Sequence, residues 1–87
     1  MEIIAFGRTV SKREHSALDE VSLTLSSLPR RFKRCEVEIV MHGASSDYEA
    51  WVAVRVSSDS GELETACVEW ITKQVTRQGY AIVLKAP

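Results

Sequence analysis

Two segments, RCEVEIVMH at residues 34–42 and YEAWVAVRV at residues 48–56, decide the fold that the sequence predicts. Apolar and polar side chains alternate along both, which is typical of strands that bury one face. The turn residues at 43–47 separate the two segments, so the pattern indicates an antiparallel hairpin. The side chains expected to point inwards are Cys35, Val37, Ile39, Met41, Ala50, Val52, Val54 and Val56. Those expected to point outwards are Arg34, Glu36, Glu38, Val40, Glu49, Trp51, Ala53 and Arg55.

Matching the apolar faces of the two strands also predicts how they pair. A slip of one residue would place Glu38 against Val52, so that slip is excluded. In the preferred register, two outward pairs attract electrostatically. The expected pairs are Met41 with Ala50, Ile39 with Val52, Val37 with Val54, Cys35 with Val56, Glu36 with Arg55, and His42 with Glu49.

One strand and one helix are predicted on each side of the hairpin. The apolar run at residues 3–7 predicts a first strand, and residues 80–84 predict a last one. Between them, a capping box at Ser11 and Glu14 predicts the start of a first helix, and Pro29 its end. A second helix is expected to start with Asp59 as its cap and to end before Gly79, which suits a left-handed backbone position. The helices bury the stripes Leu18, Val21, Leu25 and Leu28, and Leu63, Cys67, Trp70, Ile71 and Val75.

The order strand–helix–strand–strand–helix–strand predicts a single α+β domain over residues 1–87. With right-handed crossovers, the four strands form an antiparallel sheet in the order 4-1-3-2, with both helices packed on one face. This layout resembles the ferredoxin-like βαββαβ arrangement. The first and third strands are then central.

The composition limits which classes of function the sequence supports. The 11 basic and 12 acidic residues give a net charge of −1, which provides no overall attraction to nucleic acid or to an anionic membrane. No apolar run approaches the roughly 20 residues of a membrane span, and the start lacks a secretion signal. We therefore expect a cytoplasmic protein with no membrane contact. Cys35 and Cys67 are expected to be reduced core thiols, since neither has the spacing of a metal site.

No catalytic motif is present in the sequence, and we expect neither enzyme activity nor a cofactor or metal. The outward face of the hairpin instead suits a protein interface, because it has an aromatic anchor with a polar rim. We therefore expect a small regulatory or inhibitory protein that binds a protein partner and forms a homodimer. The anchor is Trp51, its surround is Val40 and Ala53, and the rim is Glu36, Glu38, Glu49 and Arg55.

Two basic clusters leave nucleic-acid binding open as the alternative. Free backbone N–H groups together with cations at the start of a helix can bind an anion. A second run of cations connects the first helix to the second strand, where it could meet an acidic surface or a phosphate backbone. The first cluster is Arg8, Lys12 and Arg13, and the second is Arg30, Arg31, Lys33 and Arg34.

Overall fold

The computed structural model describes residues 1–9 and 16–86 and shows an α+β domain. The capping box at Ser11 and Glu14, and the cations Lys12 and Arg13, lie outside the described residues. The elements are β1 (Glu2–Arg8), α1 (Ala17–Ser26), the short 3-10 helix η1 (Arg30–Phe32), β2 (Glu36–Gly43), β3 (Ala50–Ser57), α2 (Gly61–Arg77) and β4 (Ala81–Ala86).

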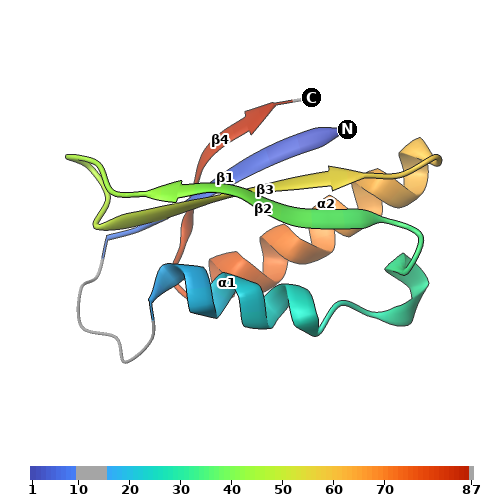
Figure 1. The fold of residues 1–87 in the computed structure, drawn as a ribbon, viewed down its shortest axis with the longest axis horizontal. Helices are drawn as coiled ribbons and strands as arrows, with labels where there is room; N and C mark the ends of the chain where they lie inside the picture. Colours follow the sequence, from blue (N-terminus) through green and yellow to red (C-terminus); the bar gives the residue numbers. More distant parts are fainter. Residues whose placement is uncertain (10–15, 87) are drawn as a thin grey trace.

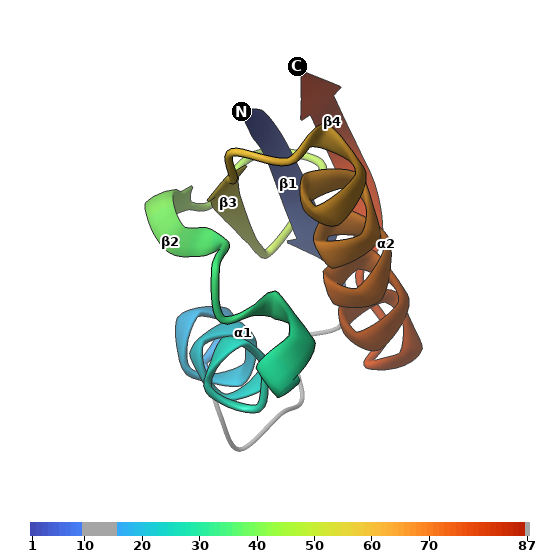
Figure 2. The ribbon, with the colours of Figure 1, turned by 90° about the vertical axis from the view of Figure 1, so that its right-hand side faces the viewer.

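The four strands form one antiparallel sheet in the order β2-β3-β1-β4. Read from the opposite edge, this order is β4-β1-β3-β2, so β1 and β3 are central. Both helices lie on the same side of the sheet (Figure 1). Helix α1 packs beneath β2 and β3, whereas α2 packs beneath β1, β3 and β4, as the end view in Figure 2 shows. Within residues 1–9 and 16–86, no helix lies on the other side of the sheet.

The core lies between the sheet and the two helices. Val52, Val54 and Val56 on β3 are fully buried, which confirms the inward face predicted for that strand. Ile4 and Phe6 on β1 meet them from the neighbouring strand. Helix α1 contributes Ala17 and Val21 to this core, and α2 contributes Cys67, Val68, Ile71 and Val75. Burial of these apolar side chains is the main term that stabilises the sheet against the helices.

The hairpin register differs from the prediction by two residues up to Ile39, and by three residues beyond it. Val37 pairs with Val56 and Ile39 with Val54, so the predicted partners Val54 and Val52 are wrong. In the part of the hairpin up to Ile39, the slip of two residues leaves each side chain on its predicted face, because side-chain direction along a strand repeats every two residues. The apolar pattern therefore excludes a slip of one residue but cannot exclude a slip of two.

A β-bulge in β2 makes the predicted inward position of Met41 wrong. Val40 is the extra residue between Ile39, which pairs with Val54, and Met41, which pairs with Ala53. An extra residue reverses the alternation for the rest of the strand. Met41 therefore lies on the outward face, 61% exposed, and not in the core as the sequence predicted. His42 pairs with Val52 and not with Glu49.

The helix starts also differ from the sequence predictions. Helix α1 begins at Ala17, where Ser16 is the N-cap and its hydroxyl accepts from the backbone N–H of Asp19. The cap of α2 is Ser60, whose hydroxyl accepts from Leu63, so the prediction of Asp59 is wrong by one residue. Gly79 has a φ of 94°, which confirms the left-handed position predicted after this helix.

Candidate functional site

The sheet side without helices, called here the outward sheet face, is built from rows of residues that run across the strands. The first row crosses all four strands, because Met41 pairs with Ala53, Ala53 with Ala5, and Ala5 with Leu84. The two alanines are buried by their neighbours, whereas Met41 and Leu84 at the ends are 61% and 55% exposed. This row, called the apolar row below, is flat in the centre and has a large apolar side chain at each end.

A second row contains two glycines that are covered by aromatic rings. Trp51 pairs with Gly43 on one side and with Gly7 on the other. A Cβ atom added at Gly43 would lie 3.0 Å from the Trp51 ring, and one added at Gly7 would lie 2.5 Å from the Tyr48 ring. The rings therefore lie over backbone that has no side chain of its own. This placement leaves Trp51 half-buried on the outward sheet face.

The turn before β3 positions Tyr48. The backbone N–H of Ser45 donates to the carbonyl of Tyr48 at 3.0 Å, and the N–H of Tyr48 donates back to the Ser45 hydroxyl at 3.2 Å. Val83 approaches the same glycine from β4, since its methyl would lie 2.7 Å from a Cβ atom at Gly7. Sequence reasoning did not assign Tyr48, Val83 and Leu84 to this face, and it placed Met41 inwards because the alternation does not reveal the bulge.

The charged residues predicted as the rim separate into two groups. Arg55 forms an ion pair with Glu38, where the sequence predicted Glu36 as its partner. Glu36 is exposed and pairs with Ser57 at the start of β2. Glu49 precedes β3, and its carboxylate lies 3.8 Å from the Arg8 side chain. Val40 is 36% exposed at the bulge. The structure therefore brings Trp51, Ala53, Arg55 and Glu38 onto one face and directs Glu49 elsewhere.

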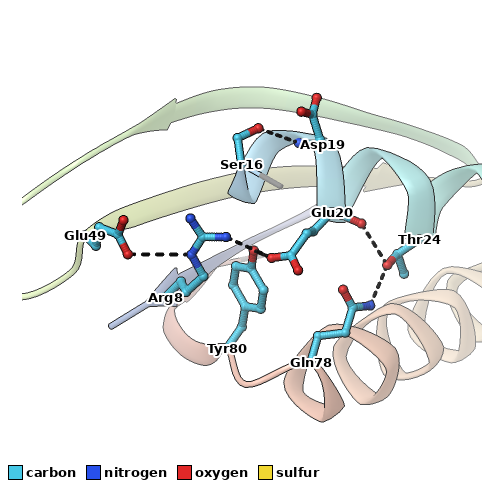
Figure 3. A network of polar contacts seen from close by, with 8 residues as sticks. All are labelled: Arg8, Ser16, Asp19, Glu20, Thr24, Glu49, Gln78 and Tyr80. Carbon is cyan, nitrogen blue, oxygen red and sulfur yellow. Dashed lines mark hydrogen bonds and ion pairs between the residues drawn. The ribbon is translucent and has the colours of Figure 1, made fainter. Parts of the chain in front are cut away.

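Arg8 belongs to a buried polar cluster at the end of β1 (Figure 3). Its side chain is 6% exposed and donates to the Glu20 carboxylate at 2.9 Å. The Tyr80 hydroxyl donates to the same carboxylate oxygen at 2.5 Å. Nearby, the Gln78 amide donates to the Thr24 hydroxyl at 2.7 Å, which connects α2 to α1. This cluster joins β1, α1 and the residues that precede β4.

The cluster shifts the acid–base behaviour of two of its members. Burial by itself would lower the pKa of Arg8, but the hydrogen bond to Glu20 and the charges nearby hold that pKa above its ordinary value. Burial, followed by the hydrogen bond to Glu20, raises the pKa of Tyr80 to about 12. Arg8 is therefore a charged residue inside the fold, with carboxylates as its neighbours.

The raised pKa of Tyr80 predicts a loss of stability in alkali. The native pKa of about 12 lies above the ordinary 10, so the unfolded chain releases this proton first. The contribution is complete below pH 10 and is lost as the pH rises towards 12, by about 1–3 kcal/mol. Urea unfolding across this range measures the loss, and Tyr80→Phe should show less of it. An equal alkaline loss in Tyr80→Phe and the wild type would contradict the assignment to Tyr80.

The second basic cluster lies on the surface. Arg30, Arg31, Lys33 and Arg34 are all exposed, while Phe32 between them is 1% exposed and anchors η1 in the core. Arg31 stacks on the Phe32 ring, with its guanidinium carbon 4.5 Å from the ring centroid. Arg34 lies 3.8 Å from Asp59, and both side chains are highly exposed, so this ion pair contributes little.

The two cysteines lie in or against the core. Cys67 is fully buried, and Cys35 packs against the same cluster with its thiol 3.9 Å from the carbonyl of Leu63. Burial, with the neighbouring Cys35, raises the pKa of Cys67 to about 12. Both cysteines are free thiols in the structure, as the sequence predicted.

Comparison of the chain with protein-family models, with curated proteins and with solved structures finds no match. Among the described residues, no helix has both the length and the apolar character needed to cross a membrane.

Proposed function

We propose that the protein is a non-enzymatic interaction module with a ferredoxin-like arrangement, which binds a protein partner through the outward sheet face. Its partner is a second copy of the chain, and a small regulatory or inhibitory protein of this kind would act as a homodimer. One observation carries the proposal: the apolar row extends unbroken from Met41 on one edge strand to Leu84 on the other.

The chemistry of this face supports an interface. Large exposed apolar side chains that adjoin a half-buried Trp are typical of an interface core. The ion pair between Arg55 and Glu38 neutralises the charges beside that core within one chain. A partner therefore meets an apolar surface whose nearest charges already compensate each other, and Glu36 remains as a polar rim at one end.

The arrangement of the apolar row favours a second copy over an unrelated partner. A two-fold axis that runs along the strands, between β1 and β3, would bring Met41 of one copy against Leu84 of the other. Ala5 and Ala53 would then face each other at the centre, where two small residues allow the sheets to approach. The surface is therefore complementary to itself under the symmetry that most homodimers adopt.

The test introduces a charge at either end of the apolar row. In Met41→Glu and Leu84→Glu, a carboxylate would be buried in the interface, so each variant should be monomeric. Leu23→Glu is the matched control, because Leu23 is 62% exposed on α1, on the helical side of the sheet, and should remain dimeric. Sedimentation equilibrium measures the mass, and circular dichroism checks that each variant is folded.

The wild type should sediment at about twice the chain mass of 9.7 kDa. A wild type that stays monomeric at every concentration would overturn the homodimer. A dimer that tolerates both Met41→Glu and Leu84→Glu would overturn the outward sheet face as its interface. Trp51→Ala should weaken association as well, since it removes the half-buried aromatic side chain at the centre of the second row.

A further inference from the structure

A groove on the helical side of the molecule lies between η1 and α2. It has a volume of about 290 Å³ and is lined by Arg31, Phe32, Ala66, Glu69, Trp70 and Lys73. The outward sheet face lies on the other side of the sheet, so a ligand in this groove does not compete with the proposed homodimer.

The floor of the groove is aromatic. The ring of Phe32 is buried, and its centroid lies 6.4 Å from that of Trp70 with the planes tilted by 53°. Trp70 packs against the core with part of its side chain and leaves the rest accessible. A half-exposed indole beside a fixed second ring is a surface on which a flat ligand ring can stack.

The walls of the groove are mainly basic. Arg31 and Lys73 are exposed and line it from η1 and from α2. Arg30 and Lys33 are exposed in the same short segment as Arg31, whereas Arg34 lies 3.8 Å from Asp59 and does not line the groove. Glu69 is the one acidic residue among the described residues that line the groove. A local excess of positive charge of this size attracts phosphate.

We infer that this groove binds a nucleotide unit of a single-stranded nucleic acid, with the base against Trp70 and the phosphate between Arg31 and Lys73. Stacking on an aromatic side chain combined with cations for the backbone is how single strands are bound without sequence preference. An acidic peptide would use the cations but has no need of the aromatic floor. A volume of about 290 Å³ suits one base and its phosphate.

The test measures binding of a fluorescently labelled single-stranded oligothymidylate by anisotropy at several salt concentrations. Arg31→Glu and Lys73→Glu should each weaken binding by about tenfold and lower the logarithmic salt slope by about 0.7 or more. Lys85→Glu is the matched control, because it makes the same charge change at a residue of β4 that does not line the groove, and it should bind like the wild type. Glu69→Gln should bind more tightly, since it removes a carboxylate from the lining.

Competing ligands identify what the groove recognises. An abasic strand of the same length should bind more weakly than oligothymidylate, because it offers no ring to Trp70. Competition by unlabelled strands but not by adenosine monophosphate at the same nucleotide concentration is the result expected for a single-stranded nucleic acid, whereas equal competition by adenosine monophosphate would overturn the strand as the ligand and assign a free nucleotide.

Several results would overturn it. These are no salt-sensitive binding by the wild type, equal binding by Arg31→Glu, Lys73→Glu and Lys85→Glu, or equal binding of the abasic strand. Displacement by polyglutamate as effective as that by oligothymidylate would assign the groove to an acidic protein instead. None of these outcomes depends on whether the protein is a dimer.

Discussion

Replacing Glu20 with alanine should lower the free energy of unfolding by about 3 kcal/mol, because it removes the main acceptor from a buried cation. Arg8 is 6% exposed and lies 2.9 Å from the Glu20 carboxylate, whereas Glu49 lies farther away at 3.8 Å. The same change also removes the acceptor of the Tyr80 hydroxyl. The substitution would therefore remove the polar contact that joins β1, α1 and the residue before β4. Urea unfolding at neutral pH measures the loss.

Two variants control for this effect. Glu20→Gln keeps a side-chain oxygen for Arg8 or Tyr80 but has no charge, so its loss should be smaller than that of Glu20→Ala. Glu36→Ala removes an exposed glutamate from β2, and its effect on monomer stability should stay within about 0.5 kcal/mol. If Glu20→Ala were as mild as Glu36→Ala, the buried cluster would not be a significant source of stability.

Replacing Gly7 with alanine should also be strongly destabilising, by about 1–3 kcal/mol. The added Cβ atom would lie 2.5 Å from the Tyr48 ring and 2.7 Å from a methyl group of Val83, both closer than atoms can approach. The ring would have to leave its place over β1, and the outward sheet face would change shape. Thermal or urea unfolding measures the stability, and near-ultraviolet circular dichroism reports the environment of Tyr48 and Trp51.

Gly61→Ala is the matched control for Gly7→Ala. A Cβ atom at Gly61 meets nothing within 4 Å, and the residue lies at the start of α2, so the change should be neutral or slightly stabilising. Removing the obstacle gives a second check: in a Tyr48→Ala background, Gly7→Ala should cost less than in the wild type. An unchanged cost in that background would show that the Tyr48 ring is not what excludes a side chain at Gly7.

The faces of β3 were predictable from the sequence because they depend on alternation within one strand. Val52, Val54 and Val56 point inwards and Trp51 and Arg55 outwards, as the pattern predicts. Positive φ at Gly79 follows similarly, since it depends only on how one helix ends. The basic segment at residues 30–34 was also visible, but not the aromatic floor beside it, because Trp70 comes from α2.

The sequence by itself therefore determined which segments form strands and helices and which face of each regular strand is apolar, since these properties repeat over a few neighbouring residues. The tertiary structure decided where that repeat breaks. The bulge at Val40 moves Met41 outwards, and it depends on how β2 meets β3. The structure also decided that Arg8 points inwards, which no local pattern indicates. Its partner Glu20 is 12 residues away along the chain, and Tyr80, which donates to the same carboxylate, is 60 residues from Glu20. Contacts of that kind exist only once the elements have packed.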